Sequence, residues 1–194
     1  RLVESSIPLE REFDFSRMDF FVQQRAGCCK GILVSPLVVS PLTGREVVRF
    51  SRRVETPEGR FNGVVFVSVS PDFLATFQDE ALQGSNDFVS VRLDSGPLLA
   101  TRLGRGSAEK RIFYKLDPSF TGTSGILREP ADKFRDGRSR YVAWRKIAGY
   151  PLVAVAGLTE EDALASYRAM ARESRVNAAT VVLQALKQRQ KGEN

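Results

Sequence analysis

Histidine is absent from the sequence of 194 residues, and cysteine occurs only twice. The missing imidazole excludes Ser-His-Asp and Cys-His catalysis, histidine-containing zinc sites and a phospho-accepting histidine from this chain. Cys28 and Cys29 are adjacent, would form a strained ring if oxidised, and are too few for a structural zinc site. We therefore interpret them as a thiol pair in a loop, and we expect neither a metal ion nor a cofactor.

Long apolar runs are also absent. No stretch of about 18 apolar residues could span a bilayer, and the longest runs, such as residues 150–158, have the length of a buried strand. No signal peptide is recognisable either. Residues 1–3, Arg-Leu-Val, resemble the inside of a strand, which predicts that the chain is a piece of a longer protein.

The charge is basic but dispersed. A net charge of +6 permits nucleic acid, an anionic ligand or a membrane surface as a partner. The arginines and lysines are spread along the chain, with clusters around residues 102–115 and 133–146, which is typical of a solvated surface. A basic nucleic-acid-binding α+β protein is the alternative function, although no groove-reading motif supports it, so we expect no nucleic acid. A third possible function is an enzyme with a carboxylate site, but the sequence offers no specific residue pair for it.

Residues 41–72 are the stretch around which the chain is organised. Two β-rich runs, residues 46–54 and 63–70, alternate apolar and polar side chains and flank a turn at residues 56–59. Ser70 stands where a helix N-cap is expected, with Pro71 at the first helical position. This pattern predicts a hairpin followed by a helix.

The remaining elements predict an α+β protein with antiparallel sheets. Helical crossovers between successive strands are largely missing, which argues against a doubly wound parallel sheet. The patterns predict strands at residues 1–6 and 31–40, helices at residues 16–27 (capped by Ser16) and 71–84, and hairpins at residues 87–103 and 140–158. They also predict mostly loop with room for a short helix at residues 104–138, and a long helix capped by Thr159.

Four motifs follow one another in a familiar order: FDFSRMDFFVQQR, ILVSPLVVSPLTGREVVRFSRRV, GRFNGVVFVSVSPDFL and RYVAWRKIAGYPLVAVAGLTEED. Together they resemble double-Cache sensor domains, which are tandem PAS-like modules, of the type attached to diguanylate cyclases and some histidine kinases. The resemblance covers about residues 1–167. It implies a membrane-distal sensing module at residues 1–84 that lacks its N-terminal helix, a membrane-proximal module at residues 85–158, and a C-terminal signalling helix and tail at residues 159–194.

The resemblance also implies a function. The chain would be the periplasmic ligand-sensing input domain of an inner-membrane receptor, and it would not itself be an enzyme. The flanking membrane helices and the output domain, a diguanylate cyclase or a histidine kinase, would lie outside this chain. The receptor would be a homodimer with a small-molecule ligand in the distal module.

The basic face of residues 46–54 supplies the candidate ligand contacts. Strand alternation places Val47, Arg49, Ser51 and Arg53 on one face. An arginine fork suits a carboxylate, so we expect a ligand that is a small anion, for example a carboxylate. The alternative is that these arginines form ordinary surface ion pairs with Glu46, Glu55 or Asp72. The predicted contacts are Arg49 and Ser51, with Arg17, Arg25, Phe20 and Phe21 from the covering helix.

The amino-acid-binding subclass of these sensors has a different set of residues. It places a Tyr, Arg, Trp, Tyr set near the covering helix and an Asp on a later strand. This chain has Phe20 and Phe21 in that helix and Ser68 and Ser70 on the strand, so it departs from the amino-acid pattern.

Overall fold

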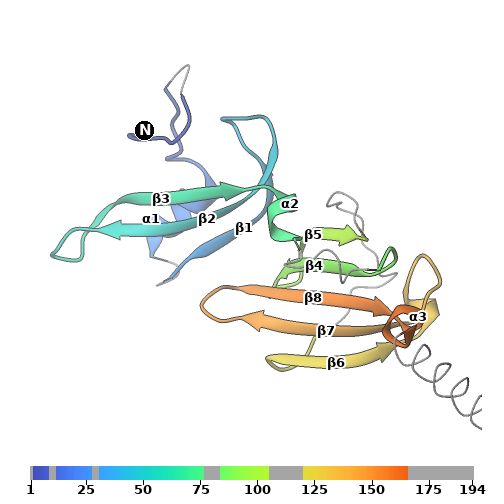
Figure 1. Cartoon of the computed structure of the whole chain (residues 1–194). Helices are drawn as coiled ribbons and strands as arrows, with labels where there is room; N and C mark the ends of the chain where they lie inside the picture. The colour runs from blue at the N-terminus through green and yellow to red at the C-terminus, as the bar shows by residue number, and fades with distance from the viewer. Residues whose placement is uncertain (1, 9–11, 28–30, 77–83, 105–119, 166–194) are drawn as a thin grey trace, which may run out of the picture.

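Two antiparallel sheets form the framework of the structure (Figure 1). The structure is a computed structural model, and it describes residues 2–8, 12–27, 31–76, 84–104 and 120–165. Every strand pair within these residues is antiparallel. The predicted α+β class is confirmed, while the module boundaries at residues 84 and 158 stay predictions.

The first sheet has the strand order β1-β2-β3, and it contains the predicted hairpin. Its strands are β1 (Leu33–Val39), β2 (Glu46–Glu55) and β3 (Phe61–Val69). In the hairpin turn the Gly59 amide donates to the Thr56 carbonyl at 2.9 Å, and Gly59 has a φ of 79°, a value that favours glycine. The pairing of β1 shifts between Val34 and Leu37, around Pro36, as expected for a proline on an edge strand.

The second sheet has the strand order β5-β4-β8-β7-β6. Its strands are β4 (Phe88–Leu93), β5 (Leu98–Leu103), β6 (Ser124–Glu129), β7 (Arg140–Ile147) and β8 (Leu152–Thr159). Both predicted hairpins are present as β4–β5 and β7–β8. The second hairpin docks against the first because β8 pairs with β4.

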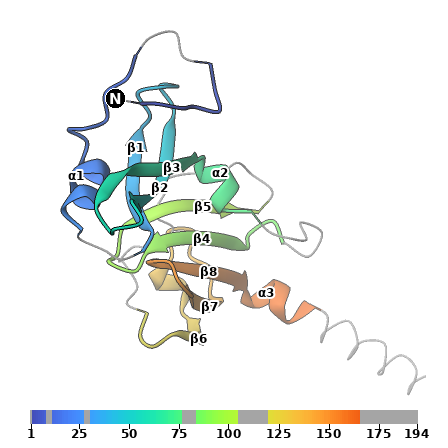
Figure 2. The same ribbon diagram turned by 90° about the vertical axis from the view of Figure 1, so that its left-hand side faces the viewer.

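One hydrophobic core joins the two sheets, which lie one above the other in Figure 2. Val34 and Val48 of the first sheet pack with Val91, Leu99 and Leu152 of the second. A second cluster inside the larger sheet consists of Phe88, Phe134, Val142, Val153 and Val155. Because Val48 lies on the opposite face of β2 from Arg49, one face of the first sheet is left for α1.

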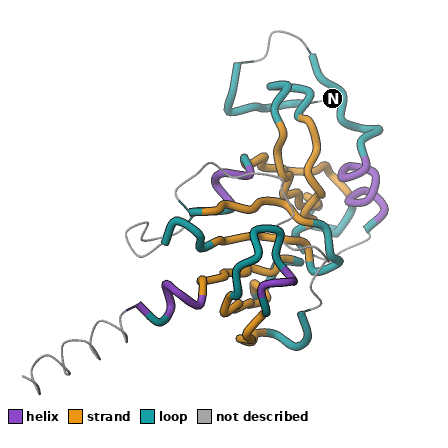
Figure 3. The backbone as a smooth tube through the Cα atoms, turned by 90° about the vertical axis from the view of Figure 1, so that its right-hand side faces the viewer, coloured by secondary structure: helices purple, strands orange, loops and turns teal. Residues whose placement is uncertain are grey.

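The helices are short and lie outside the sheets (Figure 3). They are α1 (Asp19–Ala26), α2 (Pro71–Leu74), α3 (Glu160–Ala163) and the 3₁₀ turn η2 (Ala131–Lys133). The Ser70 hydroxyl accepts from the Phe73 amide at 3.3 Å, and the Thr159 hydroxyl accepts from the Asp162 amide at 3.1 Å. The predicted N-caps at Ser70 and Thr159 are therefore confirmed.

Three local predictions are wrong. Residues 2–6 form no strand, and the Ser5 hydroxyl accepts from the Ile7 amide at 3.2 Å, which favours a turn instead. Met18, not Ser16, is the N-cap of α1, because the Ser16 hydroxyl donates to Asp14 at 2.9 Å. β6 lies in the segment predicted as mostly loop, where its alternation covers only six residues.

The two longer predicted helices are described only in part. Within the described residues α2 ends at Leu74 and α3 ends at Ala163. The rest of the predicted helix at residues 71–84 and of the C-terminal helix falls at residues 77–83 and 166–194, which lie outside the described residues, as do Cys28 and Cys29. No helix in the described part of the chain is long and apolar enough to cross a membrane.

Candidate functional site

Arg49 is a buried cation between the first sheet and α1. Its side chain lies on the β2 face that α1 covers, and the residue is only 4% exposed. The Arg49 Cζ atom lies 4.6 Å from the ring centroid of Phe20, 5.1 Å from that of Phe66 and 5.8 Å from that of Phe15. Rings at this distance attract a guanidinium through their quadrupoles. We call Arg49, these three phenylalanines and Met18 the Arg49 site.

The charge of Arg49 lacks an oxygen acceptor within the described part of the chain. Its Nη1 atom points at the Met18 sulfur at 3.8 Å, a weak acceptor, and its buried Nε has no hydrogen-bond partner. No described carboxylate forms an ion pair with it. Burial lowers the pKa of Arg49, because a low-dielectric surrounding disfavours the charged form. The Arg49 site therefore contains a buried positive charge that no described negative charge compensates.

Gln24 fixes α1 over this face. It is fully buried, and its side-chain amide donates to the Ser51 carbonyl at 2.9 Å and accepts from the Arg53 amide at 3.1 Å. Arg53 in turn donates through Nη1 to the Gln24 and Arg25 carbonyls at 3.0 and 2.8 Å, near the C-terminal end of α1. The end of the helix is therefore satisfied by β2, which keeps Phe20 over Arg49.

The structure brings some of the predicted contacts together and separates others. Arg49 and Phe20 are in contact, and Ser51 is buried beside them, its hydroxyl donating to the Leu33 carbonyl at 3.5 Å. Phe21 is half-buried and packs edge-on against Phe61, away from Arg49.

Two further predicted contacts lie away from the Arg49 site, and three residues of the site were not predicted. The side chains of Arg17 and Arg25 are exposed at the surface. Sequence reasoning missed Phe15, Met18 and Phe66. Counting outward from the hairpin turn would pair Ser51 with Val65. A register shift between Val54 and Glu55 pairs Ser51 with Phe66 instead, so the sequence carried no signal for Phe66.

A second buried arginine, Arg140 at the start of β7, is fully satisfied. Its guanidinium donates to both Asp136 oxygens, at 2.6 and 2.9 Å, and to the Asn86 carbonyl at 2.7 Å. The Phe134 ring centroid lies 4.7 Å from its Cζ. Burial alone would raise the pKa of Asp136, but the hydrogen bond and charge of Arg140 outweigh burial and lower it. Arg140 is therefore a structural ion pair.

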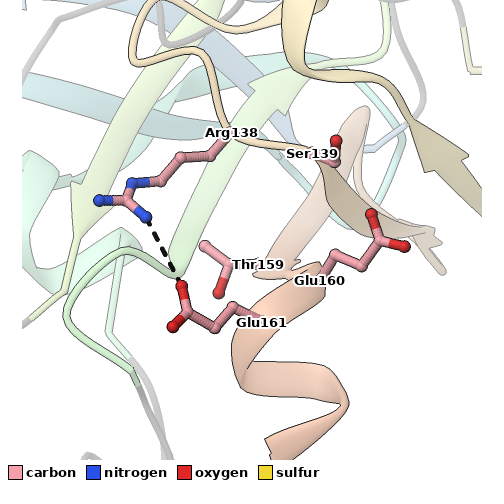
Figure 4. A pocket seen from close by; sticks show the side chains of 5 residues that line it. All are labelled: Arg138, Ser139, Thr159, Glu160 and Glu161. Atoms are coloured by element: carbon pink, nitrogen blue, oxygen red, sulfur yellow. Dashed lines mark ion pairs between the residues drawn. The ribbon is translucent and has the colours of Figure 1, made fainter.

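A hollow of about 360 Å³ lies at the start of α3, at the other end of the molecule from α1 (Figures 1 and 4). It is lined by Arg138, Ser139, Thr159, Glu160 and Glu161. Its charged groups already have partners: Arg138 lies 3.9 Å from Glu161, and Glu160 lies 2.8 Å from Arg128. Exposed charges that are already paired contribute little free energy to a new interaction. The Arg49 site is therefore the stronger candidate for a binding site.

Asp87 connects the segment between the two sheets to the start of α3. Its buried carboxylate accepts from the Gly84 amide at 2.9 Å and from the Thr159 amide at 2.8 Å. The same Thr159 is the N-cap of α3. No described cluster of three or more acidic or cysteine side chains could hold a metal ion.

The fold is shared with sensor domains of known structure. No family profile matches the chain, and no curated protein matches it. The extracellular domain of rpHK1S-Z16, described as a proposed histidine kinase, has a TM-score of 0.59 and 24% identity, covering 82% of this chain and 66% of that one.

Two chemoreceptor domains match as well. The ligand-binding domain of Pseudomonas fluorescens CtaA with L-isoleucine has a TM-score of 0.56 and 12% identity, covering 82% of this chain and 64% of that one. The ligand-binding domain of Pseudomonas aeruginosa PAO1 PctB with L-Arg has a TM-score of 0.54 and 13% identity, covering 82% of this chain and 66% of that one. The chain spans about two thirds of the length of these domains, and its fold is that of Cache-like sensor domains, as its motifs predicted.

Proposed function

We propose that this chain is the extracytoplasmic ligand-sensing input domain of a bacterial transmembrane signalling receptor, and that a small anion binds at the Arg49 site. The observation that carries the proposal is a buried guanidinium with no carboxylate partner among the described residues. The solved domains with the same fold support it, since those of CtaA and PctB hold amino acids. Following the sequence motifs, we propose a diguanylate cyclase output, flanking membrane helices and a homodimer.

An anion would change the energetics of the Arg49 site more than those of any exposed arginine. An uncompensated buried charge is costly, and a carboxylate facing Arg49 would supply two charge-assisted hydrogen bonds in a low-dielectric setting. Because Arg49 is almost fully covered, the ligand would enter by displacing α1 or residues 13–18. Binding would therefore change the position of α1 relative to the first sheet.

A path of contacts leads from the first sheet to the C-terminal end of the described chain. β3 runs directly into α2, where Asp72 lies 3.8 Å from Arg102 of β5. Further along, the Asp87 carboxylate holds both Gly84 and Thr159. We propose that ligand binding shifts the population of two arrangements of the sheets and that this shift reaches α3 through Asp87.

Thermal unfolding in the presence of small organic acids tests the binding proposal. At a ligand concentration about 100 times the Kd, the melting temperature should rise by about 5–10 °C, and Arg49→Ala should abolish the rise. Arg52→Gln is the matched control, because Arg52 is the exposed neighbour on the opposite face of β2. An acid that stabilises Arg49→Ala as strongly as the native chain would contradict the proposal.

A further inference from the structure

We infer that the ligand of the Arg49 site is a monocarboxylate with an apolar chain and without an amino group. The inference rests on the proposed function above and names the chemical class of the ligand. It follows from the groups that the site offers: one unpaired guanidinium, three phenylalanine rings and a thioether. What decides between an amino acid and a simple acid is whether an ammonium group would find acceptors.

The sheet face beside Arg49 offers no acid near the cation. The strand register places these side chains on the α1 side of the first sheet: Leu33, Val38, Val47, Arg49, Ser51, Arg53, Val64, Phe66 and Ser68. None of them is acidic. Glu55, at the end of β2, is already bonded to the Arg53 Nε at 2.7 Å. An ammonium group buried here would lose its water without gaining a charged partner.

The described part of the covering segment, residues 12–27, does not supply a buried acid either, and its Glu12 is exposed. The residues of α1 that are buried against the sheet are Phe20 and Gln24. The nitrogen and the oxygen of the Gln24 side-chain amide both form hydrogen bonds to β2. Asp19 is exposed on α1. Asp14, which is also exposed, has its pKa lowered to about 2 by hydrogen bonds from the Ser16 amide and hydroxyl. Neither carboxylate belongs to the Arg49 site.

A second anionic group on the ligand would also lack a partner. Arg53, the other cation on this face, is engaged with Glu55 and with the Gln24 and Arg25 carbonyls. The Ser51 hydroxyl is directed at the Leu33 carbonyl. The site thus matches one negative charge, and the phenylalanine rings match an apolar chain attached to it.

Three compounds that share a 3-methylbutyl chain separate these possibilities. They are 4-methylpentanoate, which carries a carboxylate, L-leucine, which adds an amino group, and 3-methylbutylamine, which has the amino group without the carboxylate. Calorimetry and thermal unfolding of the native chain would compare them, with acetate as the acid that lacks the apolar chain. We expect 4-methylpentanoate to bind at least about 10-fold more tightly than L-leucine or acetate, and the amine not to bind.

Two variants keep the outcome interpretable. Arg49→Met fills the same space without charge and should abolish acid binding, whereas Arg49→Lys keeps the charge and should retain weakened preference for the acid. Arg49-dependent binding of L-leucine with equal or higher affinity would overturn this inference and leave the proposed function standing. If neither acid nor amino acid binds in an Arg49-dependent way, both are wrong.

Discussion

Arg49 in the first sheet and Arg140 in the second are both buried against phenylalanine rings, but their charges are compensated differently. Arg140 donates to Asp136 at 2.6 and 2.9 Å and to a backbone carbonyl, whereas Arg49 has rings and a distant sulfur. A buried cation with a carboxylate and carbonyl partners fixes a structure. A buried cation without them destabilises the free state, and any anion that reaches it removes part of that cost. The difference indicates a structural role for Arg140, and it is the basis on which we propose a binding role for Arg49.

The largest effect should come from removing the partner of Arg140. Asp136→Asn removes the carboxylate that accepts two hydrogen bonds from a fully buried guanidinium, and we expect it to lower the free energy of unfolding by about 3 kcal/mol. Asp132→Asn, at an exposed acid in the neighbouring turn, should change it by less than about 0.5 kcal/mol. Chemical denaturation of both variants checks this. Equal stability of the two variants would remove the contrast between the arginines.

The pH dependence of stability tests the same ion pair. Because the folded-state pKa of Asp136 is lowered, its stabilising contribution is complete above the ordinary aspartate pKa of about 3.9 and is lost as the pH falls through the lowered pKa. The native chain should therefore lose more stability than Asp136→Asn on acidification below about pH 4. Denaturation midpoints measured across this range provide the comparison, and parallel curves would contradict the assigned role of Arg140.

A smaller loss is expected when the cover of the Arg49 site is loosened. Gln24→Ala leaves the Ser51 carbonyl and the Arg53 amide without their side-chain partner, which should cost about 2 kcal/mol of stability. Gln23→Ala is the matched control, since Gln23 is exposed on the same helix. Denaturation and hydrogen exchange of α1 measure the effect. If Gln24→Ala is as stable as Gln23→Ala, polar contacts do not hold α1 in place.

The smallest effect should come from Arg49 itself. Without ligand, Arg49→Met exchanges an uncompensated charge for an apolar side chain of similar length, so stability should change by less than about 1 kcal/mol or increase. Arg140→Met should instead destabilise, because it removes the bonds to Asp136 and Asn86. Denaturation of both variants sharpens the comparison. A loss above about 2 kcal/mol in Arg49→Met would make Arg49 a structural residue as well.

Local features of the fold were predictable, and long-range pairings were not. The caps at Ser70 and Thr159 and the hairpins follow from residues that are close in sequence, and all are present. The strand predicted at residues 1–6 is absent from the described residues 2–6. β6 was missed because a short strand depends on its neighbour β7 for its stability. The predicted covering role of Phe20 holds, but Arg25 faces outward because α1 presents only part of its surface to the sheet, and Arg17 lies exposed before the helix begins.

The sequence by itself determined on which face of β2 Arg49 lies, because strand alternation has a period of two residues. It also determined where α2 and α3 begin, because a hydroxyl caps a helix over three residues. Only the tertiary structure decided that Arg49 is enclosed by Phe15, Phe20 and Phe66, and that Arg140 reaches the Asn86 carbonyl 54 positions earlier. The compensation of a buried charge depends on groups that are distant in sequence, so identical arginines acquire different roles.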